Sequence, residues 1–160
     1  KLVEAMAKVK RPCTLFLVGG STAQEKAAIE ALIRANDLHC VHILGQLGQN
    51  ELKYLIDHCH IGIVNYGQYD RKNMYCASGK LYEFLYEGKP VVTTTNPPLL
   101  DLCRAWGVGE SSDTYADAID KVTGSYDDYC RRVQQAVQSM CIEDNNQKLV
   151  EQLKQALGLS

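Results

Sequence analysis

Short apolar runs alternate with segments of helical spacing along most of the chain. The apolar runs lie at residues 14–18, 41–44, 61–64 and 90–94, and each is followed by a polar or glycine-containing loop. Continuous runs of this length are typical of strands buried on both faces, whereas apolar residues three and four apart predict helices. The pattern therefore predicts an α/β fold: a doubly wound, Rossmann-like parallel sheet flanked by helices, with further helices at the C-terminal end.

Residues that are typical N-caps predict where several helices begin. Thr22 and Glu25 have the spacing of a capping box, and Asn50 is expected to cap a helix over residues 51–58. Four further elements are expected: a polar loop over residues 65–77, a helix opened by Asn96 and two prolines and ending at Trp106, a last edge strand at 108–111, and helices from Tyr115 to the end.

The stretch SGKLYEFLYEGKPVV, residues 78–92, contains a helix followed by a strand. Ser78 is a good N-cap, because its hydroxyl can accept a hydrogen bond from an amide of the first turn. Leu81, Phe84 and Leu85 give an apolar stripe at helical spacing, and Gly88 ends the helix. In doubly wound sheets ligands bind at the carboxyl ends of the strands, and this helix begins at such an end.

The first turn of this helix carries residues that suit a nucleotide. A helix N-terminus offers unpaired amides and a partial positive charge, so it binds phosphate readily. Gly79 lets a ligand approach the backbone, Lys80 adds a positive charge, and Glu83 shares the face of Gly79. The Glu83 carboxylate suits the hydroxyls of a ribose. The alternative, which the residues alone leave open, is a surface pair between Lys80 and Glu83.

Composition narrows the function classes. The 160 residues suffice for one domain, and a net charge of −2 does not favour a nucleic-acid partner. Seven cysteines without a C-x-x-C pair are typical of reduced thiols in a cytoplasmic protein. The residues at 39–42 and 58–60 include four histidines and two cysteines, but their spacing fits no closed zinc pattern, so no metal is expected.

The segment GKLYEFLYEGKPVVTT resembles the NKLYEYLAxGKPVV signature of retaining glycosyltransferases with two Rossmann-like domains, the GT-B architecture. It is similar to the C-terminal, donor-binding domain of glycosyltransferases of the group 1 type. The segments KLVEAMAKVKRPCTLFLVGG and VHILGQLGQNELKYLIDHCHIGIVNY resemble other parts of that domain, so the resemblance covers roughly residues 1–122.

The resemblance implies a site for a nucleoside-diphosphate sugar, with UDP or GDP as the expected nucleotide and no cofactor. It implies that Glu83 accepts hydrogen bonds from the ribose, that the Gly45–Leu47 loop borders the base, and that residues 73–77 lie near the sugar. It assigns no catalytic residue. The full set of expected binding residues is Gly45, Gln46, Leu47, Asn73, Tyr75, Ser78, Gly79, Lys80, Leu81 and Glu83.

The chain also departs from the family pattern. Many members carry a second glutamate eight positions before the first, where this chain has Tyr75. The family's phosphate-binding Arg and Lys precede its first helix, near the point where this chain begins. Arg71 and Lys72 are candidates to replace that charge, although loop cations of this kind are often only solvated.

The expected protein is the C-terminal half of a cytoplasmic two-domain enzyme. Residues 1–160 are expected to form a single Rossmann-like domain, with the N-terminal acceptor domain and the first strand expected to lie outside this sequence. The full-length hexosyltransferase would transfer a sugar to a glycan, lipid-linked or small-molecule acceptor in polysaccharide biosynthesis, with possible peripheral membrane association, and the isolated domain would be inactive. Two alternatives stay open: a sugar-nucleotide 2-epimerase-like domain, for which only Asp70 and Glu83 are obvious acid/base groups, and a non-catalytic nucleotide-binding or regulatory domain.

Overall fold

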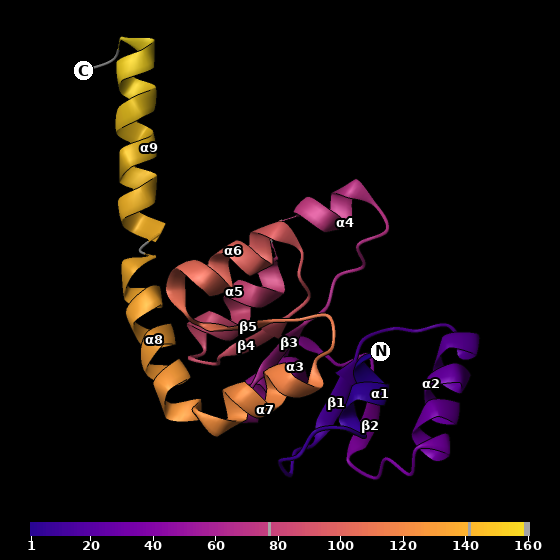
Figure 1. Cartoon of the computed structure of the whole chain (residues 1–160). Helices are drawn as coiled ribbons and strands as arrows, with labels where there is room; N and C mark the ends of the chain where they lie inside the picture. Colours follow the sequence, from indigo (N-terminus) through magenta and orange to yellow (C-terminus); the bar gives the residue numbers. More distant parts are fainter. Residues whose placement is uncertain (77, 141, 159–160) are drawn as a thin grey trace.

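The strands in the described residues form two parallel sheets (Figure 1). The computed structural model describes residues 1–76, 78–140 and 142–158. One sheet pairs β1 (Leu15–Val18) with β2 (Val41–Gly45), and the other has the order β3-β4-β5. The strands of the second sheet are β3 (Gly62–Val64), β4 (Val91–Thr93) and β5 (Gly109–Ser111). Every pairing is parallel, so the predicted α/β class is confirmed.

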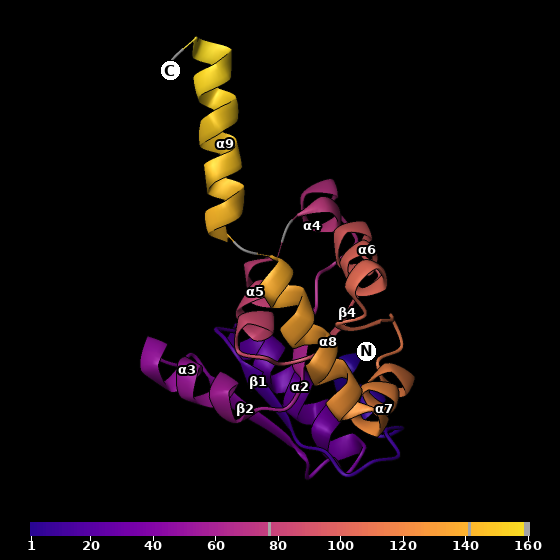
Figure 2. The same cartoon turned by 90° about the vertical axis from the view of Figure 1, so that its left-hand side faces the viewer.

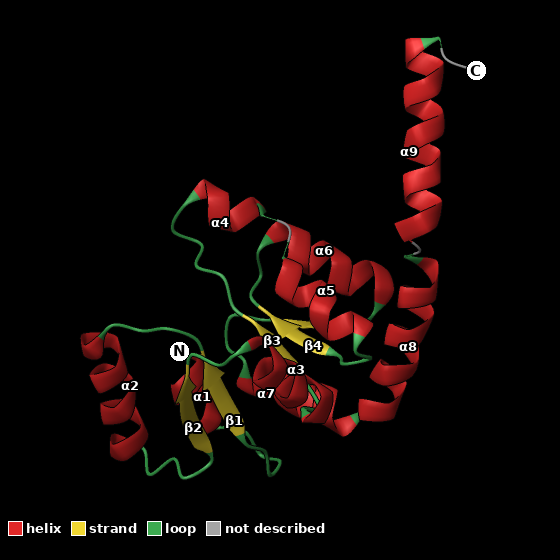
Figure 3. Cartoon of the chain, turned by 180° about the vertical axis from the view of Figure 1, so that it is seen from behind, coloured by secondary structure: helices red, strands yellow, loops and turns green. Residues whose placement is uncertain are grey.

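With the exception of α4, helices follow the strands in the order that the sequence pattern predicts. In the described residues they are α1 (Leu2–Met6), α2 (Ala23–Ala35), α3 (Gln49–His58), α4 (Arg71–Tyr75), α5 (Gly79–Tyr86), α6 (Pro97–Trp106), α7 (Ala116–Gly124), α8 (Tyr126–Ser139) and α9 (Ile142–Leu157). Figures 1 and 3 show α5 and α6 on one face of the three-stranded sheet and α7 on the other, which is the doubly wound arrangement.

The sheet is interrupted between β1 and β3. Within the described ranges β1 pairs only with β2, and β3 pairs only with β4, so each keeps one unpaired edge. Side-chain packing nevertheless continues across the interruption, because Leu15 of β1, Val41 of β2 and Val92 of β4 belong to one buried cluster. The pattern of apolar runs predicted the strands but not this division, since it contains no information on which strands are neighbours.

A missing side chain brings α5 close to β3. A Cβ atom at Gly62 would lie 2.2 Å from Cγ of Phe84, so the Phe84 ring occupies the space above the strand that any other residue would fill. Leu81 and Leu85 are both 1% exposed and pack with Val64 and Leu99 in a second buried cluster. The apolar face of α5 is therefore fixed on the sheet, and its polar face is turned away.

Local capping explains two differences from the expected boundaries. The capping box between Thr22 and Glu25 is confirmed, with the Glu25 amide 3.2 Å from the Thr22 hydroxyl. Helix α3, however, begins at Gln49 and not after Asn50, because the Glu51 carboxylate accepts from the Gly48 amide at 2.7 Å and so makes Gly48 the N-cap. A short helix, α4, also forms inside the segment 65–77 that was expected to be a loop (Figure 3).

The C-terminal helix α9 points away from the sheets (Figure 2). Leu149, Val150, Leu153 and Leu157 are at least half exposed on it. No helix in the described parts of the chain combines the length and apolar content that a membrane span requires.

Candidate functional site

The first turn of α5 is exposed to solvent, and the N-cap residue before it, Ser78, is buried. Ser78 is 2% exposed, and its hydroxyl accepts a hydrogen bond from the Leu81 amide at 3.1 Å, which confirms it as the N-cap. The Leu81 side chain is buried in the core, so Leu81 contributes no exposed group here. Within the described residues the amides of Gly79 and Lys80 have no backbone or side-chain acceptor. These two amides are the donors that the helix end offers to an anion.

Lys80 and Glu83 do not form the surface pair that the sequence left as an alternative. Both side chains are exposed, and no ion pair joins either of them to another described residue. Glu87, one turn further on, is instead paired with Lys53 at 2.9 Å. The Glu83 carboxylate and the Lys80 ammonium group therefore keep all of their hydrogen-bonding capacity for a ligand.

The space beside Gly79 is open. A Cβ atom added there would have no heavy atom within 4 Å, in contrast to Gly62, where Phe84 fills the equivalent space. Packing within the described chain therefore gives no reason for glycine at position 79. Glycine is a poor helix former, so its presence in the first turn is consistent with close approach of a ligand to the backbone.

Helix α4 holds the expected residues Asn73 and Tyr75. Asp70 is its N-cap: its two carboxylate oxygens accept from the amide and the side-chain nitrogen of Asn73, each at 2.7 Å. The Asn73 carbonyl accepts from the side-chain nitrogen of Asn96 at 3.0 Å, which ties α4 to the start of α6. Tyr75 is 58% exposed. Arg71 and Lys72 are also exposed and form no ion pair with a described residue.

The expected base-binding loop lies beyond the smaller sheet. The Gly45 carbonyl accepts from the Gly19 amide at 2.8 Å, so the loops after β1 and β2 are joined. Both glycines have positive φ, 132° at Gly19 and 71° at Gly45, which explains glycine at these turns. Gln46 and Leu47 follow Gly45, and no hydrogen bond among the described residues links this loop to the first turn of α5.

A polar network at the ends of β4 and β5 was not predicted. The Asp113 carboxylate accepts from the Thr95 hydroxyl at 2.5 Å and from the Thr95 amide at 3.2 Å. The Gln68 side-chain nitrogen donates to both, at 2.9 Å to Thr95 and 3.3 Å to Asp113. The hydrogen bond from the Thr95 hydroxyl holds the pKa of Asp113 below its usual value. The network ties the segment after β3 to the ends of the next two strands.

Tyr115, which follows this network in the chain, has an unusual backbone conformation. Its φ of 58° and ψ of −49°, together with the hydrogen bond from the Ala116 amide to the Thr114 carbonyl at 2.7 Å, define a γ-turn of the less common hand. The side chain is 2% exposed, and its hydroxyl donates to the Asn65 side chain at 2.9 Å. Strained residues of this kind cluster at functional sites.

Asn96 contains a buried acceptor without a partner. The residue is 1% exposed, and its Oδ1 atom has no donor within the described part of the chain. Asn96 was expected to open α6 and is its N-cap residue, but its side chain makes no capping hydrogen bond and instead donates to the Asn73 carbonyl of α4. It therefore belongs to the contacts that position Asn73.

Two of the histidines make stacking contacts with different aromatic residues. His42 stacks on Phe16 with the ring centres 5.5 Å apart, and His58 stacks on Tyr54 at 4.0 Å. Among the described residues no three His, Cys, Asp or Glu side chains come together as metal ligands. Six cysteines within that part of the chain are free: Cys13, Cys40, Cys59, Cys76, Cys103 and Cys130.

Comparison with solved structures identifies a protein with a similar fold. No protein-family model matches the chain, and no curated protein is significantly similar to it in sequence. Two solved structures of Alr3699/HepE from Anabaena are similar to it in structure at 20% sequence identity. The structure with UDP has a TM-score of 0.69, and the structure with UDP and glucose has 0.67. The match covers 96% of this chain and 44% of HepE in both.

This similarity extends over nearly all of the present chain but less than half of HepE. At 20% identity it establishes a shared fold. The chain therefore has the α/β fold of one part of a larger protein that is known in complex with UDP and with glucose.

Proposed function

We propose that this chain binds a nucleoside-diphosphate sugar, as the donor-binding half of a glycosyltransferase. The observation that carries the proposal is the exposed first turn of α5, where two amides without an acceptor among the described residues precede the Glu83 carboxylate, which has no ion-pair partner there. A phosphate group needs hydrogen-bond donors and the ribose hydroxyls need an acceptor, and this turn offers both. The UDP bound to HepE, a protein that shares this fold, supports the donor class.

Each expected residue receives a role under this proposal. The amides of Gly79 and Lys80 and the Lys80 ammonium group bind the diphosphate, and Glu83 accepts from the ribose hydroxyls. The loop of Gly45, Gln46 and Leu47 borders the base, while Asn73 and Tyr75 on α4 lie near the sugar. Ser78 and Leu81 act by fixing the turn, since the Ser78 hydroxyl and the Leu81 amide are already bonded to each other.

The chemistry that follows is electrostatic. As the bond between sugar and diphosphate breaks, negative charge develops on the leaving nucleoside diphosphate, and preorganised donors at a helix end stabilise it. The acceptor, a glycan, lipid-linked or small molecule, would be bound by a second domain, because the chain corresponds to 44% of HepE. The isolated chain should therefore bind the donor without transferring the sugar.

The epimerase alternative is weakened by Asp70. An epimerase needs acid and base groups free to exchange protons with the substrate. Both carboxylate oxygens of Asp70 are occupied by Asn73 as a helix cap. Of the two obvious candidates only Glu83 is unpaired within the described part of the chain, and its place beside the helix end favours the ribose role.

Calorimetric titration with UDP, GDP, CDP and ADP tests the proposal. One diphosphate should bind to the wild-type chain, and Glu83→Ala should weaken its binding by about 1–3 kcal/mol, because the ribose hydroxyls lose their acceptor. Glu87→Ala is the matched control: it removes a carboxylate from the same helix that is engaged with Lys53, and binding should be unchanged.

Two results would contradict the proposal. Equal loss of affinity in both variants would remove the special role of Glu83. Absence of binding for all four diphosphates, repeated with the corresponding UDP- and GDP-sugars, would leave a non-catalytic regulatory domain as the better description of the chain.

A further inference from the structure

Asn96 is buried at the start of α6, and helix capping does not explain its side chain. The residue is 1% exposed and is the N-cap of α6, but the side chain makes no capping hydrogen bond. A capping side chain normally accepts from the second or third amide of the helix. Here the second residue is Pro98, which has no amide hydrogen, and the Leu99 amide is already bonded to the Asn96 carbonyl at 3.0 Å. Neither position therefore needs the Asn96 side chain.

The side chain of Asn96 also leaves a buried acceptor unpaired. Its Oδ1 atom has no donor within the described residues. A buried acceptor without a donor destabilises the fold, so an apolar residue at position 96 would avoid this loss. Each such group in a native structure requires an explanation. The reason for asparagine must then lie in the other half of its amide group, the Nδ2 donor.

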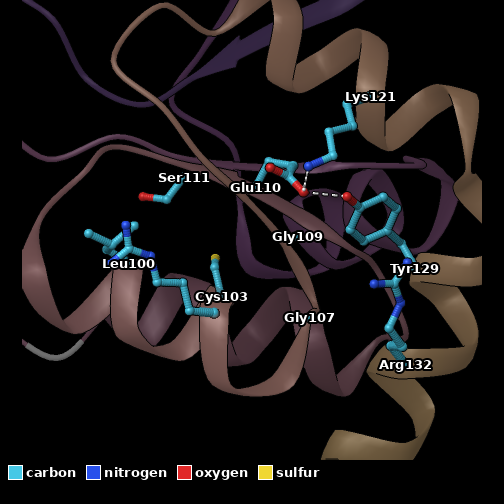
Figure 4. Close-up of a pocket in the computed structure, with 10 residues that line it drawn as sticks. Leu100, Cys103, Gly107, Gly109, Glu110, Ser111, Lys121, Tyr129 and Arg132 are labelled. Carbon is cyan, nitrogen blue, oxygen red and sulfur yellow. Dashed lines mark hydrogen bonds and ion pairs between the residues drawn. The ribbon is translucent and has the colours of Figure 1, made fainter.

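A partly buried polar group elsewhere is satisfied by neighbouring side chains. Figure 4 shows it beside β5, where a cavity of about 370 Å³ is bordered by residues of α6, α7 and α8. There Glu110 accepts hydrogen bonds from Lys121, at 2.8 Å, and from the Tyr129 hydroxyl. Burial raises the pKa of Glu110, but these hydrogen bonds outweigh burial and leave the pKa below its usual value. This network is explained by the contacts that it makes between β5, α7 and α8.

The Nδ2 donor of Asn96 fixes the position of α4. It donates to the Asn73 carbonyl at 3.0 Å. Among the described residues this is the only hydrogen bond or ion pair that joins α4 to another helix or strand. The bonds from Asn73 to Asp70 close only the first turn of α4 itself. Asn96 therefore sets where α4 lies relative to β4 and α6.

Helix α4 lies close to the phosphate-binding turn of the proposed function. Tyr75, the last residue of α4, precedes Ser78 by three residues, so their Cα atoms lie within about 11 Å of each other. In the proposed function Glu83 binds the ribose, and the amides of Gly79 and Lys80 bind the diphosphate. A nucleotide bound in this way runs along α5 toward its N-terminal end. The sugar beyond the diphosphate then lies on the side where α4 leads into the helix.

We propose that Asn96 is the positioning residue for the sugar end of the donor site. By holding Asn73 it keeps α4 beside the sugar, so it governs the affinity for the nucleoside-diphosphate sugar and not the affinity for the nucleoside diphosphate alone. Asn96 acts through Asn73 and does not touch the ligand. The inference rests on the proposed function and deepens it by separating the part of the site that recognises the sugar from the part that binds the nucleotide.

The test compares two ligands on the same chain by calorimetric titration: the nucleoside diphosphate that binds in the titration above, and its glucose conjugate. Asn96→Ala should weaken binding of the conjugate on the order of tenfold, because α4 loses its anchor, and should change the affinity for the diphosphate by less than about twofold. Asn36→Ala is the matched control. It removes a side-chain amide that donates to the Leu32 carbonyl at 2.9 Å at the end of α2, and both affinities should be unchanged.

The ratio of the two affinities separates positioning from a general structural role. Loss of both affinities by the same factor, or an unchanged affinity for the conjugate, would overturn the inference and leave the proposed function in place. If no diphosphate binds, the proposed function fails and the inference fails with it. Should Asn96→Ala not fold, Asn96→Ser replaces it with the same expectation, because its hydroxyl is one bond too short to reach the Asn73 carbonyl.

Discussion

The hydroxyl of Tyr115 donates a hydrogen bond to the Asn65 side chain across 50 residues of sequence, at a distance of 2.9 Å. Asn65 directly follows β3, and Tyr115 is the N-cap residue of α7. The bond therefore fixes the start of the segment that leads through α4 to the first turn of α5. Because Tyr115 is held in a γ-turn, its ring direction is set by the backbone as well as by packing.

Tyr115→Phe should lower the free energy of unfolding by about 1 kcal/mol, because it removes one hydrogen bond while keeping the ring. Asn65 is exposed, so water can replace the lost donor and the cost stays small. Urea unfolding measures the change. A loss above about 3 kcal/mol would mean that the hydroxyl supports more than this single contact. Nucleotide affinity, measured in parallel, should fall, since the segment after β3 loses one of its anchors.

Gly79→Ala should separate stability from binding. Alanine is a better helix former than glycine, and the space for its methyl group is open, so the free energy of unfolding should rise by about 0.5 kcal/mol. Nucleoside-diphosphate affinity should fall on the order of tenfold, because the methyl group blocks approach to the backbone. Denaturant unfolding and calorimetric titration provide the two readings.

Gly88→Ala is the contrasting substitution at the other end of α5. Gly88 has a φ of 71°, so alanine there should destabilise the fold by about 1 kcal/mol without changing nucleotide affinity. If both glycine substitutions affected stability and binding in the same direction, the special role of Gly79 would be lost.

Gly62→Ala should destabilise the fold strongly. The new methyl group would overlap the Phe84 ring, and α5 would have to move away from β3. Overpacking of this kind costs about 1–3 kcal/mol. The double variant Gly62→Ala with Phe84→Ala should lose less stability than the two single variants added together, because alanine lacks the Cγ and Cδ atoms that the new methyl group would overlap. Losses that simply add would show that the ring is not the obstacle.

Glu110 should make stability depend on pH in the acidic range. Its pKa is lowered in the folded chain, so its contribution is complete above the usual pKa of 4.5 and is lost as the pH falls through the folded value. Thermal unfolding between pH 3 and pH 7 measures this dependence. Glu110→Gln should be less stable near pH 7 but should lose less on acidification. Parallel curves for the two proteins would contradict the assignment.

The sequence predicted correctly the features that depend on residues close together in the chain. Ser78 as an N-cap and the capping box of Thr22 with Glu25 were predicted correctly, because each depends on residues three apart. Helix α4 was not predicted, although Asp70 and Asn73 have capping spacing, since five residues give too little periodicity. The division between β1 and β3 lies beyond local rules, because strand neighbours are set by tertiary packing.

The candidate site was predicted only in part for the same reason. The segment from Ser78 to Glu83 is contiguous, so its spacing could be read directly. The network of Asp113 with Thr95 and Gln68 joins three loops, and no pattern within one segment indicates it. The available signal was the position of these loops at the carboxyl ends of parallel strands, and that position does not say which loops meet.

The interruption between β1 and β3 has a consequence for cooperativity. No backbone ladder joins the two sheets in the described residues, so only side chains such as Leu15 and Val92 transmit stability from one to the other. We therefore expect the two sheets to open as separate cooperative units with different free energies in native-state hydrogen exchange. A ligand that contacts the loops beyond both sheets would stabilise the two units together and convert two opening reactions into one.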